Sequence, residues 1–502
     1  MVKTIEEINE KILNGSARVV TAEEMPAIVA ELGEEGALKE VDVVTTGTFG
    51  AMCSSGAFFN FGHADPPIRM EKAWINDVEM YAGLAAVDAY LGATQESVTR
   101  GINYGGAHVL EDLIAGKTVE IRAQAKGTDC YPRKSIENEL LLEDFNQAIM
   151  CNPRNSYQRY AAATNSTDRT IHTYMGALLP GCGNVSYSGA GCLSPLINDP
   201  KLRCTGTGVP IFLGGAQGSI VGPGTQNSPG TLFATIMTTG NMKEMSTDYV
   251  RGAAMTGYGV TLYLGLGVPI PVTDIDIVRN TAVRDEDIKT NIVDYGVPSR
   301  NRPVLAQVSY ADLKSGAVEI NGEEVRTSAL SSFKKARQVA AELKSWVENG
   351  KLTVNLPTRR TDPTIVVKPM RESKRPPTVR EIMNTNVVSI NETEDIKTAA
   401  KKLLNAQTNH LPVVNAAGNV VGIVTTYDVS KSVVNDKSDG KVSEIMSKNV
   451  VTTTPDEVVD IAVMKLERNK ISALPIVDAN GHLAGLLNAV DLGKLVGKRW
   501  TK

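Results

Sequence analysis

The chain has 502 residues, of which 42% are hydrophobic and 22% are charged, a composition typical of folded globular proteins. Its formal net charge of −4 lacks the basic excess that nucleic-acid-binding proteins carry. No apolar run is as long as a membrane-spanning helix, and the N-terminus begins as an acidic amphipathic helix rather than as a signal peptide. We therefore expect a cytoplasmic protein of two or three domains that binds neither nucleic acid nor membranes.

Helical and strand patterns are mixed along the first 360 residues, which predicts a large N-terminal domain of the mixed α/β class, 1–360. Short apolar runs predict strands at 41–46, 118–124, 210–214 and 259–265. Helical patterns predict helices at 71–90 and 332–348. Residues 176–230 are rich in Gly, Ser, Thr, Asn and Pro, and so long a loop region in a compact domain indicates a binding site.

The chain has six cysteines, which lie far apart at positions 53, 130, 151, 182, 192 and 204. In a chain of this length they do not indicate a disulfide framework, and none forms a Cys-x-x-Cys pair. A metal or cluster site built from Cys182, Cys192 and Cys204 is an alternative, but their spacing matches no standard site. We therefore predict no metal site and no tightly bound cofactor.

Cys130 is a candidate nucleophile because cationic residues surround it. Lys126, Arg133 and Lys134 lie within four positions of it, after a predicted strand and before a helix predicted from Ser135 onward. Nearby cations and a helix N-terminus favour the thiolate, the form in which a cysteine is nucleophilic. Asp129 opposes this effect. An inert, half-buried cysteine is an alternative of about equal weight.

Cys53 lies in a small, polar, glycine-rich segment, 45–56, that follows an apolar strand. Such a segment allows the backbone to approach a ligand closely. A packed cysteine in a tight turn explains the pattern equally well. The segment by itself leaves both interpretations open.

The C-terminal region contains an internal repeat. Residues 361–378, with their prolines and like charges, predict a linker that leads into it. Matching residues of the repeats are 63 positions apart with no insertion or deletion, as between Gly418 and Gly481. Each repeat, 379–435 and 442–498, has the pattern of a helix, two strands joined by a glycine-containing turn and a final helix.

The two repeats resemble the CBS family over their full length, which implies a tandem pair of α/β units with a cleft between them. Thr425 and Asp428 fit the family's nucleotide-contact pattern, and Asn488 and Asp491 hold the matching positions of the second repeat. A carboxylate there can accept hydrogen bonds from both ribose hydroxyls, and a helix N-terminus can receive a phosphate. We expect an adenosyl-type ligand; the alternative is that these side chains only cap helices.

Segments spread along the large domain resemble one known family, and with the CBS pair the resemblance covers essentially the whole chain. They are Thr46–Gly56, Asn103–Asp112, Gly127–Pro132, Gly214–Gly218 and the end of the domain near Leu356. The family is that of the L-aspartate-semialdehyde sulfurtransferases of methanogens and anaerobes, which act in homocysteine biosynthesis and often have a C-terminal CBS pair. The resemblance implies that Cys53 and Cys130 are the functional cysteines and that Cys130 carries a persulfide.

The implied reaction converts the aldehyde of aspartate semialdehyde into the thiol of homocysteine, with sulfide or a sulfane sulfur donor as the sulfur source. Addition of sulfur and loss of water give a thioaldehyde, which needs two electrons to become the thiol. The sequence contains no nicotinamide fingerprint and no cluster motif, so we expect an external two-electron donor. The resemblance suggests a separate ferredoxin-like iron–sulfur protein. We also expect a homo-oligomer.

Two assignments stay open within this hypothesis. Cys53 either resolves a disulfide with Cys130 or helps to receive electrons. The substrate carboxylate needs a partner, and a guanidinium binds it with two hydrogen bonds. The candidates are Arg69, Arg154, Arg159 and Arg169.

Two other functions compete with this one. The first is a different CBS-regulated metabolic enzyme, such as a barrel like that of IMP dehydrogenase, in which the CBS pair is typically inserted in the barrel rather than terminal. The second is a non-catalytic nucleotide sensor that switches a partner, which the CBS pair alone supports. The dispersed cysteines and the glycine-rich region favour catalysis, so we predict an enzyme, a sulfurtransferase.

Overall fold

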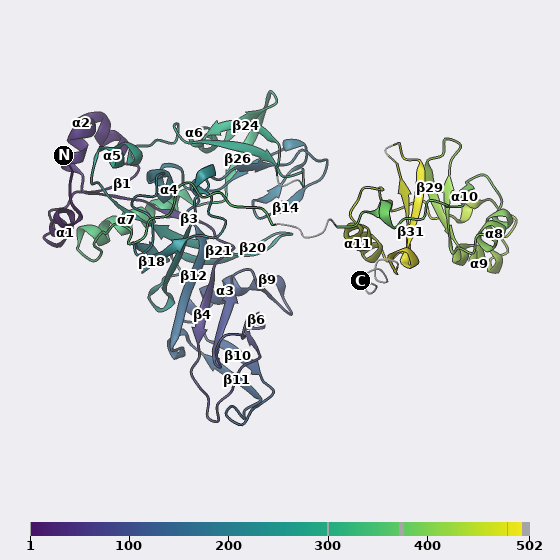
Figure 1. Ribbon diagram of the computed structural model, residues 1–502, viewed down its shortest axis with the longest axis horizontal. Coiled ribbons are helices and arrows are strands. Elements are labelled where there is room, and N and C mark those ends of the chain that lie inside the picture. Colours follow the sequence, from purple (N-terminus) through teal and green to yellow (C-terminus); the bar gives the residue numbers. More distant parts are fainter. Residues whose placement is uncertain (1, 299–300, 371–375, 479, 494–502) are drawn as a thin grey trace. The chain divides into compact units, whose positions relative to one another are not determined.

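A computed structural model provides the structure of the chain, and the described residues are 2–298, 301–370, 376–478 and 480–493. The chain divides into two compact units, residues 1–368 and 369–502 (Figure 1). Among the described residues, no helix combines the length and the apolar character that crossing a membrane requires.

The N-terminal unit begins with a small sheet and the helices that cover it. The sheet has the order β1 (Val19–Thr21), β2 (Val43–Thr45), β22 (Pro269–Pro271). The helices of this region are α1 (Ile5–Leu13), α2 (Met25–Glu40), α5 (Ile275–Thr281) and α7 (Phe333–Glu348). Ala336 and Ala340 of α7 are fully buried against Val20 and Val44 of the sheet, which fixes the long helix on it.

A nine-stranded sheet forms the centre of the unit. Its order is β20 (Val250–Met255), β21 (Gly259–Gly267), β17 (Pro210–Leu213), β18 (Ala216–Pro223), β19 (Ile236–Asn241), β12 (Gln147–Asn155), β4 (Gly56–Asn60), β7 (Asp88–Gly92), and β3 (Thr48–Ala51) pairs with β21. These pairings are antiparallel. One face of β4 and β12 is buried, through Ala57, Phe59 and Met150, and the other carries the exposed Phe58 and Ile149.

A six-stranded sheet packs on the buried face of these strands, and together they make a projection that we call the arm, residues 56–151 (Figure 1). The order of this sheet is β11 (Ser135–Leu140), β10 (Val119–Gln124), β5 (Lys72–Ile75), β6 (Val78–Met80), β8 (Glu96–Ser97), β9 (Gly101–Gly105). Helix α3 (Gly106–Ile114) contacts strands of both sheets. Its Leu110 and Leu113 are fully buried in the shared core.

A second six-stranded sheet completes the unit. Its order is β24 (Val304–Ser309), β23 (Lys289–Asp294), β13 (Ala162–Thr164), β16 (Val185–Tyr187), β26 (Glu323–Ala329), β25 (Ala317–Ile320). Beside it are the hairpin β14 (Ile171–Thr173) and β15 (Gly176–Leu178) and the helices α4 (Pro195–Asn198) and α6 (Tyr310–Ser315). The mixed α/β class predicted from the sequence is confirmed.

The predicted strands at 41–46, 118–124, 210–214 and 259–265 are confirmed as β2, β10, β17 and β21, and the predicted helix at 332–348 as α7. The helix predicted at 71–90 is wrong, because the segment forms β5, β6 and the start of β7. Asn76 and Asp77 have positive φ angles of 46° and 68°, and they make the tight turn between β5 and β6. The helix predicted from Ser135 is also wrong, because 135–140 is β11, paired with β10.

The C-terminal unit contains two α/β repeats. The first has β27 (Ile390–Asn391), α8 (Ile396–Asn405), β28 (His410–Val414), β29 (Val420–Thr425) and α9 (Thr426–Val434), and the second has α10 (Val442–Ile445), α11 (Val459–Asn469), β30 (Ala473–Val477) and β31 (Leu483–Asn488). Bridges join the repeats in reciprocal fashion, Asn384 with Leu486 and Ile423 with Ser447. The final helix predicted for the second repeat runs past residue 493, and residues 494–502 lie outside the described residues.

Candidate active site

Cys53 lies at the turn between β3 and β4, two strands of the nine-stranded sheet. β3 pairs with β21, with Ala51 opposite Tyr263, and the chain then turns so that β4 can pair with β12 and β7. The Ser55 amide donates a hydrogen bond of 3.0 Å to the Met52 carbonyl, which closes the turn. The Cys53 side chain is half-buried, and the Thr261 hydroxyl donates to its Sγ at 3.3 Å.

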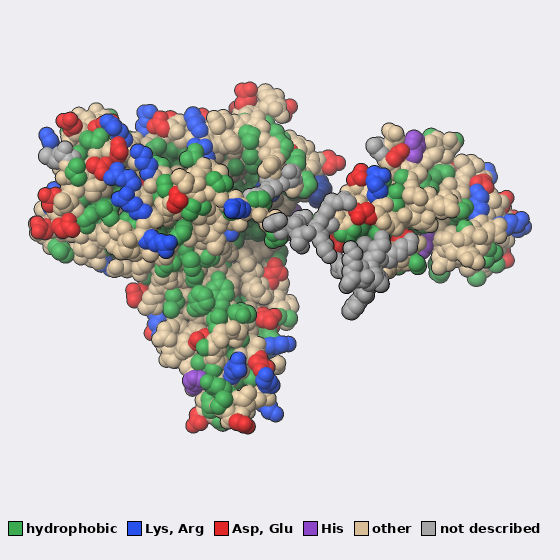
Figure 2. Space-filling view, viewed as in Figure 1, with side chains coloured by type: hydrophobic (Ala, Val, Ile, Leu, Met, Phe, Trp, Pro, Cys, Tyr) green, Lys and Arg blue, Asp and Glu red, His purple; other side chains and the backbone are tan. Residues whose placement is uncertain are grey.

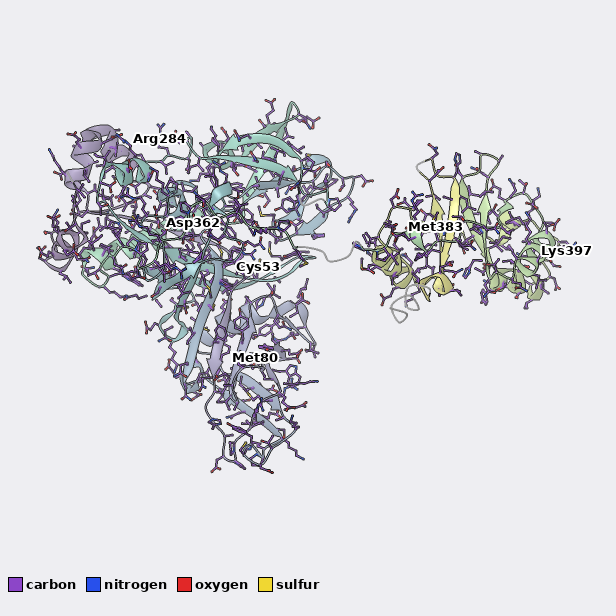
Figure 3. The ribbon with its side chains drawn as sticks, viewed as in Figure 1. Cys53, Met80, Arg284, Asp362, Met383 and Lys397 are labelled. Carbon is purple, nitrogen blue, oxygen red and sulfur yellow. The ribbon has the colours of Figure 1, made fainter. Side chains whose placement is uncertain are left out.

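Cys53, which is labelled in Figure 3, lines a pocket of about 450 Å³ at the junction of the nine-stranded sheet and the second six-stranded sheet. The residues that give it its chemical character come from four separate segments of the chain. Cys53 comes from the β3–β4 turn, Arg154 lies in the bulged end of β12 with Tyr157 just after it, Tyr174 lies in the β14–β15 turn, and Tyr258 lies in the β20–β21 turn. The pocket is large enough for a small amino acid.

Arg154 is the cation of this pocket. Its side chain is half-buried, and its Nε donates a hydrogen bond of 3.1 Å to the Thr225 hydroxyl, which orients the guanidinium. The other three arginines proposed as carboxylate partners, Arg69, Arg159 and Arg169, are exposed and do not line the pocket. Of the four candidates, Arg154 is therefore the one that lines this pocket.

Tyr157, Tyr160, Tyr174 and Tyr258 also line the pocket. Burial raises the pKa of Tyr157 to about 12, against the opposing effect of Arg154. Burial also raises the pKa of Tyr160 and of Tyr258. The Tyr174 hydroxyl is 2.6 Å from that of Tyr295, so these two share a hydrogen bond. With these raised pKa values the phenols of Tyr157, Tyr160 and Tyr258 keep their protons at neutral pH, and they can donate hydrogen bonds to a negatively charged oxygen.

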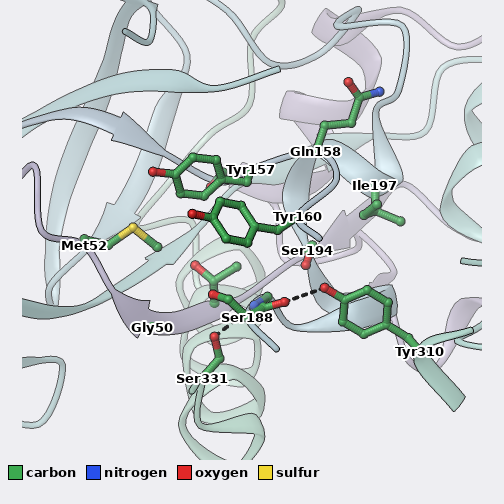
Figure 4. Close-up of a pocket in the computed structure, with 13 residues that line it drawn as sticks. Gly50, Met52, Tyr157, Gln158, Tyr160, Ser188, Ser194, Ile197, Tyr310 and Ser331 are labelled. Carbon is green, nitrogen blue, oxygen red and sulfur yellow. Dashed lines mark hydrogen bonds between the residues drawn. The ribbon is translucent and has the colours of Figure 1, made fainter. Parts of the chain in front are cut away.

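A small cavity of about 20 Å³, room for about one water molecule, lies behind Tyr157 and Tyr160 (Figure 4). Both tyrosines also line the Cys53 pocket, so they form the wall between the two spaces. The buried Ser156 hydroxyl lines the cavity and has no hydrogen-bond partner, with a positive φ of 50°. The inner wall of the pocket is thus polar.

Cys130 lies in a different place, at the far end of the arm. It occupies a two-residue turn with Asp129, closed by hydrogen bonds of 2.9 and 3.1 Å between the backbones of Thr128 and Tyr131. The Cys130 side chain is exposed, and its Sγ is 3.6 Å from the Thr128 hydroxyl. Because β11 follows, no helix N-terminus lies beside the thiol, which corrects one of the two reasons given for its reactivity.

The cations near Cys130 have partners of their own. An Arg133 Nη donates a hydrogen bond of 2.7 Å to the Asp65 carbonyl, and the Lys126 ammonium is 3.5 Å from the Glu71 carboxylate. The reactivity of this cysteine therefore rests on its exposure at the apex of a turn, with cations close by, rather than on a helix dipole.

The structure does not bring Cys53 and Cys130 together within one chain. Cys53 precedes the start of β4, and His63, which follows the end of β4, stacks on Tyr131 with 5.9 Å between ring centroids. From Gly56 to Asn60 the extended strand alone covers about 13 Å. Cys53 is labelled at the base of the arm, whereas β11 lies toward its free end (Figures 1 and 3).

The other four cysteines lack the surroundings of a nucleophile. Burial raises the pKa of the Cys151, Cys182 and Cys204 thiols, and that of Cys192 to about 12. Among the described residues, no three His, Cys, Asp or Glu side chains converge as metal ligands would.

The C-terminal unit has its own pocket of about 470 Å³ in the cleft between the repeats. Thr425 lines it, together with Ile423 from the first repeat and the segments 447–451 and 470–473 from the second. Asp428 does not line it; its carboxylate accepts hydrogen bonds of 2.8 and 2.6 Å from the amide and hydroxyl of Thr425, as a helix cap.

The matching residues of the second repeat have the same local geometry. The Asp491 carboxylate accepts a hydrogen bond of 3.1 Å from the Asn488 amide, and the Asn488 side chain accepts one of 3.1 Å from the Asp491 amide. Asp491 is 4% exposed. Of the four residues proposed to bind an adenosyl ligand, Thr425 is the one that lines the described cleft.

The sequence analysis missed the tyrosines of the Cys53 pocket. Tyr157, Tyr160, Tyr174 and Tyr258 lie in three loops that belong to no recognised motif and meet only in the folded chain. One signal was present in the sequence: Tyr157 and Tyr160 follow closely after Arg154, which was one of the predicted carboxylate partners. Nothing in the sequence connects these residues with Cys53.

Two family models match the chain. One, described as a homocysteine biosynthesis enzyme, sulfur-incorporation, matches residues 17–354, and the CBS domain model matches residues 379–435 and 442–497. A Methanosarcina acetivorans protein named L-aspartate semialdehyde sulfurtransferase is 52% identical over 498 residues, with 99% of each chain covered. A protein of the same name from Methanocaldococcus jannaschii is 48% identical over 513 residues, again with 99% of each chain covered.

Among solved structures, the CBS domain pair of protein MJ0100, in complex with 5′-methylthioadenosine and S-adenosyl-L-methionine, is 32% identical to this chain. The similarity covers 25% of this chain and 99% of that one, with a TM-score of 0.24.

Proposed function

The chain belongs to the family of sulfur-incorporating homocysteine biosynthesis enzymes, and on that premise we propose that it is an L-aspartate semialdehyde sulfurtransferase that works through a cysteine persulfide. The observation that supports this most is the pocket of Cys53. It combines a thiol, a guanidinium and several protonated phenols around a space that fits a small amino acid. These are the groups that a substrate with a carboxylate and an aldehyde needs.

Arg154 binds the carboxylate of the substrate in this proposal. A guanidinium forms two parallel hydrogen bonds to a carboxylate, which fixes the orientation as well as the position. Tyr157 and Tyr258 then donate hydrogen bonds to the aldehyde oxygen as sulfur adds and negative charge develops there. The raised pKa of Tyr157, about 12, keeps its proton available as a donor at neutral pH.

The sulfur atom arrives as the terminal sulfur of a persulfide on Cys130. That sulfur adds to the aldehyde carbon, and the carbonyl oxygen takes up a proton. The adduct has the substrate carbon joined through two sulfur atoms to the Cys130 side chain. Holding the sulfur on the protein raises its effective concentration beside the aldehyde.

Cys53 then releases the substrate by thiol–disulfide exchange. Its thiolate attacks the Cys130 sulfur, a Cys53–Cys130 disulfide forms, and the substrate leaves as a thiohemiacetal after taking up a proton. Loss of water gives the thioaldehyde. A ferredoxin-like iron–sulfur protein supplies two electrons, and with two protons these reduce the thioaldehyde to the thiol of homocysteine.

Hydrogen sulfide restores the enzyme by opening the Cys53–Cys130 disulfide. The sulfide attacks the Cys130 sulfur and gives the Cys130 persulfide, and the Cys53 sulfur leaves as the thiol. In sum, the steps convert one aldehyde, one hydrogen sulfide, two electrons and two protons into one thiol and one water. In this cycle Cys53 acts as the resolving cysteine, which releases the substrate by forming a disulfide with Cys130, and this is the first of the two roles left open by the sequence.

The experiment measures homocysteine formed by the full-length chain from aspartate semialdehyde, sulfide and a reduced iron–sulfur protein. The wild type is expected to form homocysteine, and Cys130→Ser to form none. Cys182→Ser is the matched control, because Cys182 lies outside the pocket, and it keeps wild-type activity. Undiminished turnover by Cys130→Ser would contradict the persulfide role.

For the C-terminal unit we propose an adenosyl-type ligand in the cleft between the repeats. A pocket of about 470 Å³ with the Thr425 hydroxyl and the Lys470 ammonium in its lining supports a ligand with a ribose or a charged tail. Titration of the full chain with adenosine nucleotides and with S-adenosylmethionine tests the proposal by calorimetry. Absence of heat with every member of the set would contradict it.

A further inference from the structure

We infer that the active site is shared between two copies of the chain, with Cys130 of one copy completing the Cys53 pocket of the other. This inference rests on the proposed function, in which Cys53 and Cys130 exchange a disulfide. A disulfide needs Cα atoms within about 7 Å of each other. One chain holds its two cysteines at opposite ends of β4, so the exchange needs another Cys130.

The outward face of the arm offers the contact that would bring it. Phe58 on β4 and Ile149 on β12 lie directly opposite each other in register, and they are 41% and 42% exposed. Val221 on β18 is 42% exposed, and the Tyr90 ring packs on Phe58 with 4.8 Å between centroids. Figure 2 shows hydrophobic side chains gathered over β4 and β12. We call this surface the arm face.

The arm face is almost free of charge. Among the described residues of β4, β7, β18 and β19, and of β12 as far as Cys151, the one charged residue is Asp88. Its carboxylate accepts a hydrogen bond from the Asn60 side chain, so part of its charge is already satisfied. Depletion of charged residues and enrichment in aromatic ones are the features that distinguish the core of a protein–protein interface from ordinary surface.

The position of the arm face selects a second copy as its partner. Phe58 is the middle residue of β4, five positions after Cys53 and five before His63, whose ring stacks on Tyr131 next to Cys130. A two-fold axis that lies between two stacked arm faces, parallel to the sheets and at right angles to β4 at the level of Phe58 and Ile149, runs the two β4 strands in opposite directions. It sets the Phe58–Ile149 pair of one copy against the same pair of the other, as an isologous interface requires.

The same axis places the tip of each arm over the base of the other. Positions before Phe58 in one copy then face positions after Phe58 in its partner, so the Cys130 turn meets the Cys53 pocket. The Cys130 turn belongs to the sheet behind β4 and β12, and it reaches the tip of the arm beyond the end of β4, where His63 stacks on Tyr131. From this tip the exposed turn extends past the edge of the contact to the partner's pocket. Both sites of the dimer are completed by one symmetric contact.

Mixed dimers test the shared site. Full-length Cys53→Ser and Cys130→Ser chains with different affinity tags are co-expressed, and the mixed species is purified through both tags. Each variant alone is inactive under the proposed function. In the mixed dimer one of the two sites has Cys53 from one copy and Cys130 from the other, so about half of the wild-type rate per dimer is expected.

The outcomes of this experiment separate the two proposals. An inactive mixed dimer, made from variants that are each inactive, would overturn the shared site and leave the proposed function standing; the arm would then have to bend within one chain. Full activity of either variant alone would instead contradict the proposed function.

A substitution in the arm face tests the contact itself. Ile149→Asp places a charge at the proposed axis, and sedimentation is expected to change from dimer to monomer, with at least a tenfold loss of homocysteine formation. Val304→Asp is the matched control, because Val304 is 55% exposed on β24 of another sheet. Circular dichroism checks that both variants are folded. A monomeric wild type, or a folded and active Ile149→Asp monomer, would overturn the inference.

Discussion

Cys53 and Cys130 lie in opposite surroundings although they belong to one proposed reaction. Cys53 is half-buried at the base of the arm, among an arginine and several tyrosines, and the Thr261 hydroxyl donates to its sulfur. Cys130 is exposed at the apex of a turn at the other end, with the Thr128 hydroxyl as its polar contact. One thiol has a binding site but little access, and the other has access but no binding site.

The difference suggests that Cys53 and Cys130 have different roles in the reaction. An exposed thiol can meet sulfide, whereas a thiol in a pocket can act only on what the pocket binds. A carbonyl substrate needs the pocket, because orientation and donors to its oxygen are what lower the barrier to addition. Each of the following predictions is a way to weaken or to sharpen this division.

Among substitutions in the pocket, the largest effect is expected from Cys53→Ser. The variant loses homocysteine formation by a factor on the order of 10³, because no thiol resolves the adduct on Cys130. Mass spectrometry after sulfide treatment and addition of substrate should then detect the substrate joined to Cys130 through sulfur. A variant that turns over normally would show that Cys53 has no part in release.

Alkylation is expected to separate the exposed Cys130 from the buried Cys192 and Cys204 by a similar factor. Iodoacetamide at pH 8 should label Cys130 quickly, whereas Cys192, whose pKa burial raises to about 12, has a thiolate fraction of only about 10⁻⁴ there. A raised pKa means that the folded thiol keeps its proton as the pH rises, so Cys192 labelling stays slow until the pH approaches that value or the chain unfolds. Peptide mapping measures each rate.

That comparison has a clear negative outcome. If Cys192 or the buried Cys204 is labelled as fast as Cys130 in the folded protein, the contrast between one accessible thiol and several inert ones is wrong.

Arg154→Gln tests the carboxylate partner and should lower kcat/KM for aspartate semialdehyde by about 100-fold, mostly through KM. A hydrogen-bonded charge pair of this kind contributes about 1.5–3 kcal/mol. Arg159→Gln is the matched control, because Arg159 is exposed and does not line the pocket. Equal kinetics of the two variants would remove Arg154 from the binding site.

Tyr157→Phe removes one donor and keeps the ring, and about a tenfold loss in kcat is expected from one lost neutral hydrogen bond. The variant should leave KM almost unchanged if the hydroxyl acts on the developing oxyanion rather than on the bound aldehyde. Steady-state kinetics separate the two parameters, and a change confined to KM would assign the hydroxyl to ground-state binding.

The smallest effect belongs to the C-terminal unit. Thr425→Val should weaken binding of an adenosyl ligand several-fold and leave basal homocysteine formation unchanged, while loss of the α9 cap costs about 1 kcal/mol of stability. Thr425→Ser keeps the hydroxyl and should leave both properties unchanged. Calorimetry and thermal unfolding measure them, and equal affinity of Val and Ser variants would show that the hydroxyl has no ligand contact.

How much of this could be predicted from the sequence depends on how local the signal is. Helix α7 was predictable because Ala336, Ala340 and Leu343 recur at helical spacing on one buried face. The repeats were predictable because they carry the same residues at a fixed offset. In these cases the information lies within one short segment, and tertiary contacts only reinforce it.

The arm was mispredicted because its period of two was overlooked. Ala73 and Ile75, and then Val78 and Met80, recur at every second position, and they are buried as two alternating strands around the turn at Asn76 and Asp77. The turn chemistry, two residues that tolerate positive φ, was the signal that should have decided it. At 135–140, pairing with β10 overrides a sequence that has no strong strand propensity.

The site was predictable only in part. Cys53 and Cys130 came from the family resemblance, and the choice of Arg154 among four arginines required the fold. The tyrosine wall depends on loops between β strands far apart in the chain, which no local pattern connects. Neither could the separation of the two cysteines be foreseen, since it follows from the direction of β4 within the arm.

The most direct test of the account is mass spectrometry of the full-length enzyme after it has been oxidised and exposed to sulfide. We predict one added sulfur atom on the peptide that contains Cys130, none on the peptides of the four buried or half-buried cysteines outside the pocket, and loss of the adduct when aspartate semialdehyde and reductant are added. A sulfur adduct on Cys53 with an unmodified Cys130, or an adduct that the substrate does not remove, would contradict it.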